Sequence, residues 1–460
     1  MARIEDSVLD RFDRAYFIGI GGIGMSALAR YFHAKGWLVA GYDKTPSPLT
    51  HELDSEGIPV HYEDLGESIP EPYKDEERSL IVYTPAIPAE LGELKFFQRS
   101  RARLYKRSEV LGIITRISKG LGVAGTHGKT TTSSMLAYLL SRSRTGCNAF
   151  LGGIATNFGT NLVLHPTSPY TVVEADEFDR SFLQLDPYCS IITSDDPDHL
   201  DIYGNANYFR EGFKAYAALI HPEGCLVQRY GLNLQSSASV ITYGINEEQA
   251  DYSGYNLRFI QGSFLFDVRT PDGVMQDIEL GIPGMHNAEN AVACIALSNF
   301  LGIGESTIRD GLKTFRGVKR RFEYVIRTPE LVYIDDYAHH PTEIKALVSS
   351  VRQLYPDKKI IGVFQPHLFS RTRDFFEGFA KELSALDEVI LMPIYPAREQ
   401  PIPGVSSQKL LDALTNETKN LLEPAEVIHA LGERKEGVFL TIGAGDIDRI
   451  VEPLKKSLLS

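Results

Sequence analysis

Short, nearly continuous apolar stretches alternate with segments of helical length in the first third of the chain. The predicted strands run over about 15–20, 37–42 and 79–83, and the first helix runs over about 25–35. Continuous apolar strands joined by helices are typical of a parallel sheet that is covered on both faces. The charged segment 70–78 is expected to be an exposed loop.

The same alternation begins again near Lys119 and once more after Phe322. Predicted strands of the later parts are 170–174, 189–193, 331–335, 359–364, 388–392 and 437–441. Between them, alternating patterns at about 235–280 indicate a β-rich subdomain. A chain of 460 residues is too long for one ordinary core, and roughly 150 residues per domain suggests about three. We therefore expect three α/β domains in series.

A phosphate-binding loop is predicted where the second part begins. An apolar strand runs into Gly125-x-x-Gly128-Lys129-Thr130 and then into a helical stretch at 133–140. Glycines let backbone N–H groups approach phosphate oxygens, a lysine can reach the β and γ phosphates, and a threonine hydroxyl can bind Mg²⁺. The motif is shorter than the usual Gly-x4-Gly-Lys-[Ser/Thr], so a simple glycine-rich turn is the alternative. The strand before it and the helix after it favour ATP binding.

A second glycine turn follows the first predicted strand. Gly19-x-Gly21-x-x-Gly24 and an acid about 20 residues later, Asp43, fit a dinucleotide-binding fingerprint. Such a turn recognises a pyrophosphate, which a nucleotide sugar also carries. The remaining alternative is that these glycines serve only strand–helix packing.

Acidic segments end two strands of the second part. Glu174 ends one strand, and the run 195–201, which includes His199, ends the next. In a parallel sheet the carboxyl ends of strands share one edge, so both residues are expected beside the phosphate loop. Oxygen ligands with one imidazole suit Mg²⁺ better than zinc, although acidic strand ends are often only solvated surface.

Two further groups accompany the predicted nucleotide site. Asn287 and Asn290 precede the apolar run 291–300, where one could cap the helix and the other could read an adenine edge. Arg320 and Arg321 lie between the second and third parts, where a guanidinium could hold a phosphoryl group when domains close. Solvated linker arginines are the alternative.

The composition of the chain argues against several kinds of binding partner and cofactor. The formal charge is −13 and no Lys/Arg-rich run occurs, which argues against nucleic-acid and anionic-membrane partners. The 4 cysteines are scattered without a Cys-x-x-Cys pair, so neither a disulfide framework nor a zinc site is indicated. The first residues lack an apolar signal core, and nowhere do about 18 apolar residues run together. We expect a cytoplasmic protein, either a monomer or a weak homodimer.

Taken jointly, these segments resemble the Mur ligase family of ATP-dependent amino-acid ligases. The motifs that carry the resemblance are Gly19–Met25, Ala124–Thr130, Glu174–Glu177 with Ser181–Leu183, Gly317–Phe322, Asp335–Thr342 and Phe364–His367. It implies a Rossmann-like domain for a UDP-sugar (1–115), a central P-loop ATPase-like domain (116–318) and a Rossmann-like domain that closes over ATP and brings the amino acid (319–460). The motifs further imply that L-alanine is joined to UDP-N-acetylmuramate through an acyl phosphate, with ATP and Mg²⁺.

The resemblance also assigns roles position by position. Lys129, Glu174, His199 and Arg321 are the expected catalytic residues, and Thr130, Glu174 and His199 the metal ligands. The expected ATP-binding residues are Gly125, Thr126, His127, Gly128, Lys129, Thr130, Thr131, Asn287, Asn290, Arg321 and Asp336. Those for the UDP-sugar are Gly19, Gly21, Gly22, Ile23, Gly24, Asp43, Thr84, Pro85 and Ala86. Those for the amino acid are Tyr337, His339, Arg371 and Arg398.

The chain departs from the family pattern in a few places. Ser194 stands where relatives usually have Asn, and Phe178 where many have Ser. Leu368 replaces an arginine expected near the amino acid, which leaves Arg371. Arg398 also follows the carboxyl end of a predicted strand, so it is expected on the same sheet edge as Arg371 and could replace the missing arginine, although pairing with a neighbouring acid or with solvent is the alternative.

Lys214 is a conceivable counterpart of a carbamoylated lysine in relatives, but a salt bridge on the helix surface explains it more simply. Three other functions remain open from the sequence. An NAD-dependent dehydrogenase would leave the phosphate loop unexplained, and a non-catalytic nucleotide switch would leave Glu174 and His199 without a role. A ligase for a recycled tripeptide shares much of the pattern.

Overall fold

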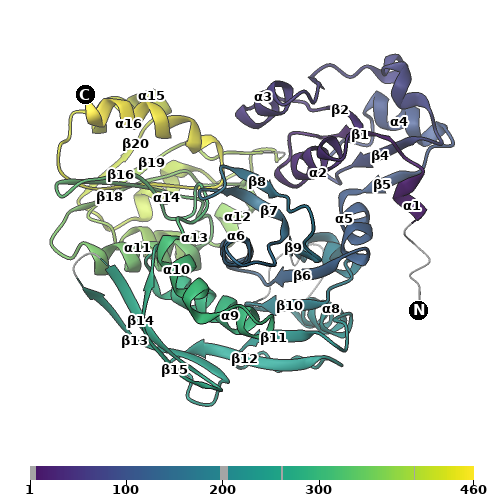
Figure 1. The fold of residues 1–460 in the computed structure, drawn as a ribbon. Helices are drawn as coiled ribbons and strands as arrows, with labels where there is room; N and C mark the ends of the chain where they lie inside the picture. The colour runs from purple at the N-terminus through teal and green to yellow at the C-terminus, as the bar shows by residue number, and fades with distance from the viewer. Residues whose placement is uncertain (1–6, 197–205, 261–262, 398) are drawn as a thin grey trace. The chain divides into compact units, whose positions relative to one another are not determined.

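The computed structural model describes residues 7–196, 206–260, 263–397 and 399–460, which form two compact units (Figure 1). The first unit comprises Met1–Arg258, Phe264–Gly281 and Asn287–Arg316. The second comprises Phe259–Ser263, Ile282–His286 and Gly317–Ser460. Two of the sheets lie in the first unit and one lies in the second, and candidate site residues follow strand ends within each unit.

The first sheet has five parallel strands in the order β3-β2-β1-β4-β5. The strands are β1 (Arg14–Ile18), β2 (Leu38–Tyr42), β3 (Val60–His61), β4 (Ser79–Tyr83) and β5 (Leu104–Lys106). The helices of this region are α1 (Ser7–Asp10), α2 (Ile23–Ala34), α3 (Pro48–Ser55), α4 (Gly92–Arg99) and α5 (Arg107–Arg116), with short 3-10 turns η1 (Gly66–Ser68) and η2 (Glu71–Lys74). The strand order changes direction at β1, because β2 and β3 lie on one side of it and β4 and β5 on the other. The turn after β1 therefore lies at the position where doubly wound sheets bind ligands.

Helix α2 is held on this sheet by a continuous apolar core. Phe17 of β1 and Phe32 of α2 are both fully buried, and Trp37 stacks on Phe32 with ring centroids 4.5 Å apart. The near-continuous apolar composition of β1 and β4 matches strands that are covered on both faces.

The second sheet has ten strands in the order β15-β14-β13-β12-β11-β10-β6-β9-β7-β8. Its inner strands are β6 (Lys119–Ala124), β9 (Tyr170–Glu174), β10 (Cys189–Ile192) and β11 (Cys225–Arg229), and the hairpin β7 (Asn148–Ala155) and β8 (Thr160–Val163) forms one edge. The β-rich segment forms β12 (Ser239–Ile245), β13 (Tyr252–Ile260), β14 (Ser263–Thr270) and β15 (Gly273–Leu280), which continue the sheet on the other side. Its helices are α6 (Lys129–Ser141), η3 (Phe178–Gln184), α8 (Ala206–Ala218), α9 (Met285–Phe300) and α10 (Glu305–Thr314).

Strand β6 lies between β9 and β10 and is parallel to both. The loop after Ala124, the carboxylate of Glu174 and the segment after Ile192 therefore emerge along one edge, as the sequence predicted for adjacent parallel strands.

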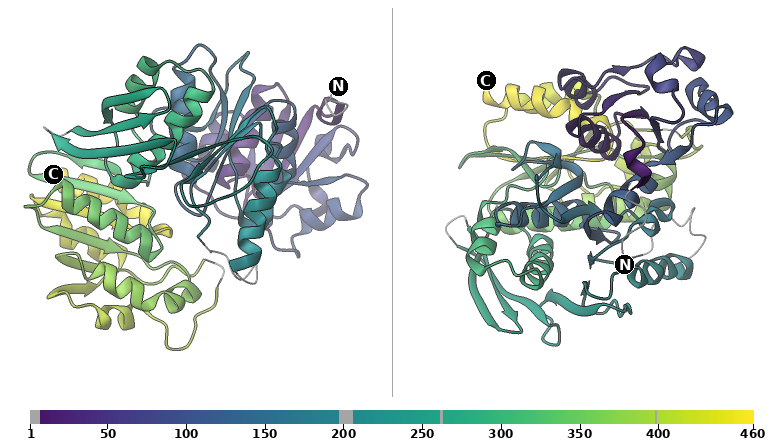
Figure 2. Two further views of the ribbon diagram at one scale, coloured as in Figure 1. Left: turned by 90° about the horizontal axis from the view of Figure 1, so that it is seen from below. Right: turned by 45° about the vertical axis from the view of Figure 1, so that its right-hand side comes forward.

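The third sheet, in the second unit, has the order β16-β17-β21-β18-β19-β20, with only β16 antiparallel to its neighbour. Its strands are β16 (Glu323–Arg327), β17 (Leu331–Asp336), β18 (Ile360–Phe364), β19 (Glu388–Leu391), β20 (Thr418–Leu421) and β21 (Gly437–Ile442). The helices are α11 (Pro341–Leu354), α12 (Phe369–Asp374), α13 (Phe376–Leu383), α14 (Ser407–Ala413), α15 (Pro424–Gly432) and α16 (Val451–Leu459), with η4 (Asp446–Ile450). Helices α11, α13 and α14 cover one face and α15 and α16 the other, each with its own apolar cluster (Figure 2).

Candidate functional site

The predicted phosphate loop joins β6 to α6. Gly125 and Gly128 have φ angles of +132° and +81°, which L side chains rarely adopt. A Cβ at Gly125 would also lie 2.1 Å from Thr193 Oγ1. Gly128 is the N-cap of α6 and supplies no side-chain acceptor, so the start of the helix is open to an anion.

Lys129 is the first residue of α6, and its side chain, which is 13% exposed, folds back into the loop. It donates to the carbonyl oxygen of Gly125 at 2.7 Å and to both carboxylate oxygens of Glu177 at 2.7 and 2.9 Å. Burial alone would lower the pKa of Lys129, but the carboxylates of segment 174–177 outweigh it and hold that pKa above its usual value. The lysine therefore stays cationic, as phosphate binding requires. Sequence reasoning gave Glu177 no role, although it stands only three residues after Glu174.

Thr130 and Glu174 lie together where the sequence predicts metal binding. The Thr130 hydroxyl is 3.0 Å from each carboxylate oxygen of Glu174. A Cβ at Gly152 of β7 would lie 1.8 Å from Glu174 Oε2, so the carboxylate rests directly on the backbone of that strand. In the described part of the chain, no three His, Cys, Asp or Glu side chains gather into a ready-made cation site.

A hydroxyl and one carboxylate nevertheless fit Mg²⁺. This ion prefers oxygen ligands and is commonly held by one or two carboxylates together with substrate phosphates. His199, the third predicted metal ligand, lies outside the described residues.

The segment after β10 supports the loop from the other side. Ser194 Oγ accepts a 3.1 Å hydrogen bond from the backbone N–H of His127, and Thr126 Oγ1 donates to the carbonyl oxygen of Asp196 at 2.6 Å. Ser194 therefore makes a direct contact with the phosphate loop.

Both asparagines lie within α9 rather than before it. The helix begins at Met285, several residues before the apolar run 291–300. The sequence did not indicate this start, because the first turns of the helix are polar. Neither asparagine is therefore the N-cap, and that part of the sequence interpretation was wrong. Asn290 lies beside the phosphate loop, since a Cβ at Gly128 would be 2.9 Å from Asn290 Oδ1, and Asn287 is 3% exposed.

The glycine turn of the first sheet joins β1 to α2. Gly19 has φ +91°, and a Cβ there would lie 2.7 Å from Thr84 Cγ2. Asp43 Oδ2 accepts a 2.8 Å hydrogen bond from the backbone N–H of Gly21, so this acid braces the turn. Gly22 caps α2 without any side-chain hydrogen bond. The structure thus brings three of the predicted sugar-nucleotide segments together: the turn, Asp43 and the residues after β4.

In the second unit, Arg321, Asp336 and Tyr337 lie close together. The Arg321 guanidinium carbon is 5.0 Å from the centroid of the Tyr337 ring. Asp336 accepts backbone N–H groups of Phe322 and Ala338 at 2.7 and 2.8 Å, and each oxygen keeps a second lone pair for another donor. Arg320, in contrast, donates to the carbonyl oxygen of Gly443 at 2.6 Å and supports the backbone.

A second group in this unit contains three of the residues predicted or implied for the amino acid. His339 Nδ1 lies 2.9 Å from the carbonyl oxygen of Tyr337, and the rings of His339 and His367 have centroids 6.3 Å apart. Arg371 Nη1 lies 3.4 Å from His367 Nδ1. In the sequence His367 stands out only as part of the motif Phe364–His367, whereas the fold brings it beside His339 and Arg371.

Arg398 lies outside the described residues, but its neighbour is informative. Glu399 Oε2 accepts a 2.9 Å hydrogen bond from the backbone N–H of Ser370, the residue before Arg371. The chain next to Arg398 is therefore tied to the start of the helix that carries Arg371. Lys214 pairs with Glu211 at 2.8 Å on the surface of α8, as the simpler interpretation predicted.

Among the helices of the described segments, none combines the length and the apolar character needed to cross a bilayer. The four cysteines are buried and unbridged.

Comparison with known proteins identifies the family. Models of the Mur ligase family match residues 14–119 (Mur ligase family, catalytic domain), 123–298 (Mur ligase middle domain) and 320–447 (Mur ligase, glutamate ligase domain). A UDP-N-acetylmuramate–L-alanine ligase of Porphyromonas gingivalis is 51% identical over 450 residues, which cover 97% of this chain and 99% of the relative. One from Flavobacterium johnsoniae is 47% identical, with 98% and 99% covered.

Solved structures agree with this result. A UDP-N-acetylmuramate–alanine ligase from Thermotoga maritima superposes with a TM-score of 0.83 at 29% identity, covering 96% of this chain and 98% of its own. A murein peptide ligase from Psychrobacter arcticus, at 20% identity and TM-score 0.69 with 97% and 98% covered, shares the fold. Because the family models span nearly the whole chain and the relatives are about half identical over the same length, the chain belongs to the Mur ligase family.

Proposed function

We propose that this chain is an ATP-dependent ligase that joins L-alanine to the carboxylate of UDP-N-acetylmuramate, the first peptide step in making the peptidoglycan precursor. The observation that carries the proposal is near-full-length identity of 46–51% to ligases of this name. The phosphate loop, in which Lys129 bonds to Gly125 and Thr130 to Glu174, supports the proposal because ATP-dependent ligation needs these groups at the phosphates.

The proposed reaction has two steps, activation of the sugar carboxylate and formation of the amide bond. The carboxylate of the sugar attacks the terminal phosphorus of ATP, which forms an acyl phosphate and releases ADP. The amino group of L-alanine then attacks the acyl carbon, so that the amide bond forms, phosphate leaves and the amine loses a proton.

The first step depends on positioning and charge neutralisation rather than on a base. Lys129 carries its positive charge to the phosphates, and the N–H groups at the start of α6 bind phosphate oxygens. Thr130 and Glu174 would hold Mg²⁺, which neutralises phosphate charge when bound. We assign Asn290 to the nucleotide as well, and its position beside Gly128 of the same loop supports this assignment.

The other substrates are assigned by domain. We assign the UDP-sugar to residues 1–115, where Gly19–Gly24 and Asp43 form a pyrophosphate turn, and ATP to 116–318. We assign the amino acid to 319–460, where Arg371 would hold its carboxylate through paired N–H donors, with Tyr337 and His339 nearby. Arg321 and Asp336 are assigned to the γ phosphate and the ribose of ATP, respectively.

One assay tests the proposal. ADP formation is measured with UDP-N-acetylmuramate and, in parallel, L-alanine, glycine, L-serine or the tripeptide L-alanyl-γ-D-glutamyl-meso-diaminopimelate. We expect turnover to be fastest with L-alanine and to require the UDP-sugar. Preference for the tripeptide would instead indicate a recycling ligase. ATP binding without ADP formation under any of these conditions would indicate a nucleotide switch.

A further inference from the structure

The ammonium group of Lys129 has no spare hydrogen in the phosphate loop as it stands. An ammonium carries three N–H donors, and the three acceptors within 2.9 Å are Gly125 O and the two oxygens of Glu177. Glu177 is 1% exposed, so its carboxylate is a buried partner of the lysine rather than a surface acid.

The pairing is specific within an acidic loop. After Glu174, three acids follow in the next five residues, and each has a different cation. Asp176 lies 3.7 Å from Arg107, Glu177 lies 2.7 Å from Lys129, and Asp179 lies 3.0 Å from Lys106. The loop ends in an unusual turn, in which Asp179 and Arg180 adopt positive φ angles of 52° and 53°.

The Glu177 carboxylate is negatively charged and lies in the loop where the negatively charged phosphates of a nucleotide are expected to bind. To reach a phosphate oxygen, Lys129 must give up or share at least one of its bonds to Glu177 or Gly125. Charge-assisted bonds of this kind are the strong ones, and a buried carboxylate that loses its partner is costly.

We propose that Glu177 is a positioning residue that holds the Lys129 ammonium in the nucleotide-free loop and competes with the phosphates for it. The proposal rests on the proposed function only in requiring that this loop binds a nucleotide. Glu177 keeps the lysine side chain in the loop before ATP arrives, at the expense of nucleotide affinity.

Two consequences of opposite sign follow for Glu177→Gln. The amide keeps the size of the side chain but removes its charge, so the phosphates face a weaker competitor and nucleotide affinity rises. The lysine is also held less firmly, so turnover falls, because rate depends on groups that are oriented in advance. A purely structural role would weaken binding and turnover together.

The test is calorimetric titration of ADP without Mg²⁺ into the full-length wild type, Glu177→Gln and Asp176→Asn. Asp176 is the matched control, since it belongs to the same loop but faces Arg107, and its Oδ1 acceptor for the Phe178 N–H survives the change. We expect ADP to bind Glu177→Gln about fivefold to tenfold more tightly, which is about 1 kcal/mol, and Asp176→Asn within about twofold of wild type. Turnover of Glu177→Gln should fall.

Unchanged or weaker ADP binding by Glu177→Gln overturns the proposal. Equal tightening in Asp176→Asn overturns it as well, because the effect would then be one of general charge. Glu177→Asp provides a variant that keeps the charge but retracts it by one methylene, and an intermediate affinity is expected even if the glutamine variant does not fold. Absence of ADP binding by the wild type would overturn the proposed function together with this inference, whereas the other outcomes bear on Glu177 alone.

Discussion

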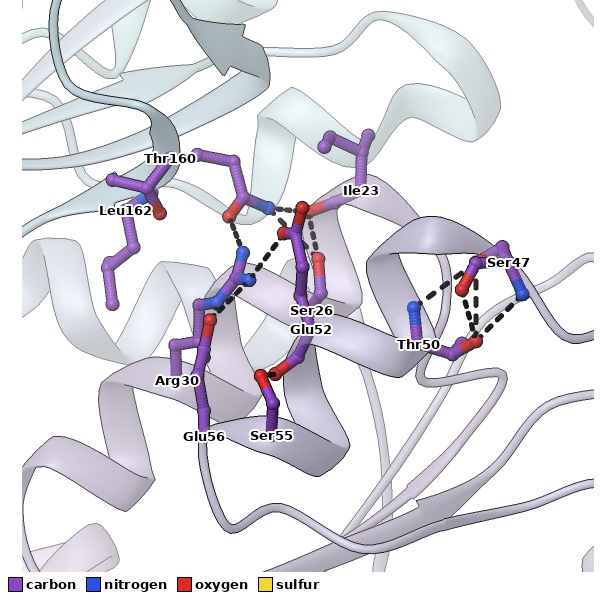
Figure 3. Close-up of polar contacts among 11 residues, drawn as sticks. Ile23, Ser26, Arg30, Ser47, Thr50, Glu52, Ser55, Glu56, Thr160 and Leu162 are labelled. Atoms are coloured by element: carbon purple, nitrogen blue, oxygen red, sulfur yellow. Dashed lines mark hydrogen bonds and ion pairs between the residues drawn. The ribbon is translucent and has the colours of Figure 1, made fainter. Parts of the chain in front are cut away.

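Arg30 of α2 donates a 2.6 Å hydrogen bond from Nη1 to Oδ1 of Asn161, which lies on β8 at the edge of the ten-stranded sheet. The same asparagine donates to the carbonyl oxygen of Ile23 at 2.6 Å and to Ser26 Oγ at 2.9 Å. Arg30 in turn binds Glu56 at 2.7 Å, as Figure 3 shows for the contacts around this guanidinium. The helix that follows the glycine turn is thereby fastened to the hairpin whose other strand supports Glu174.

Replacing Asn161 with Ala should lower the free energy of unfolding of this region by about 2–4 kcal/mol. The change removes three hydrogen bonds, two of them buried, and leaves Arg30 Nη1 and Ile23 O without this partner. Urea unfolding followed by tryptophan fluorescence measures the effect, because the only tryptophan, Trp37, stacks on α2. Glu52→Gln is the control, since Glu52 also binds Arg30 but is 54% exposed, and it should change stability by less than about 1 kcal/mol. Equal effects of the two changes would contradict the assigned role of Asn161.

Lys129→Ala should abolish ATP-dependent turnover while UDP-N-acetylmuramate binding stays within a few-fold of wild type. The lysine meets developing phosphate charge, which is worth about 3 kcal/mol or more in rate, whereas the sugar nucleotide is assigned to the first sheet. Steady-state ADP release and calorimetry measure the two quantities, with the exposed Lys313→Ala as control. Loss of UDP-sugar binding in Lys129→Ala would refute the assignment by domain.

Glu174→Gln and His199→Ala should both raise the Mg²⁺ concentration needed for half-maximal turnover. Each change removes a ligand that the proposal places beside the phosphates. Titration of Mg²⁺ in the turnover assay measures the shift, and Glu211→Gln on the surface of α8 serves as control. If turnover and Mg²⁺ dependence are unchanged in both variants, neither residue is a metal ligand.

Arg371→Ala and Arg398→Ala should each raise the KM for L-alanine about tenfold or more and leave the KM for ATP unchanged. A charge-assisted guanidinium–carboxylate contact is worth roughly 1.5–3 kcal/mol, and the hydrogen bond from Ser370 to Glu399 ties the chain next to Arg398 to the helix that carries Arg371. Arg373→Ala is the matched control, because Arg373 lies on the same short helix but pairs with Asp374 at the surface. A normal KM for L-alanine in Arg398→Ala would exclude that residue from the amino-acid site.

Asp335→Asn should become more stable relative to wild type as pH rises. Burial raises the pKa of Asp335 to about 7, against the pull of Arg320 and a hydrogen bond from Thr441. A carboxyl whose pKa is raised by folding contributes stability that is fully present below its unfolded pKa, near 4, and is lost as pH rises through about 7. The wild type therefore loses this stability as pH rises, whereas Asp335→Asn, which does not titrate, keeps its own. The free energy of unfolding of the variant minus that of the wild type should rise by up to roughly 4 kcal/mol between about pH 4 and pH 8.

Thermal unfolding at pH 5, 6, 7 and 8 measures this difference. Glu388→Gln is the control with the opposite sign, because hydrogen bonds from Arg434 and Lys359 lower the pKa of Glu388. Its effect should be nearly constant from pH 6 to pH 8. A stability difference for Asp335→Asn that does not change with pH would show that Asp335 is already ionised in the folded protein at pH 5.

The sequence predicted most of the strands and both glycine loops, because these features follow from local pattern. The strands predicted at 79–83 and 170–174 coincide with β4 and β9. Short runs of apolar residues are typical of inner parallel strands, which are buried on both faces. The start of α9 was missed because its first turns are polar and carry no apolar periodicity.

What the sequence by itself determined is thus the set of α/β elements, the two glycine loops and the chemical types of the residues at strand ends. Only the tertiary structure decided which side chains meet. Glu177 binds Lys129 across 48 positions of sequence, and Asn161 binds Arg30 across 131. Such pairs depend on strand order and on the path of the chain between sheets, which no local spacing encodes, so they emerge only when the complete fold brings distant segments within hydrogen-bonding distance.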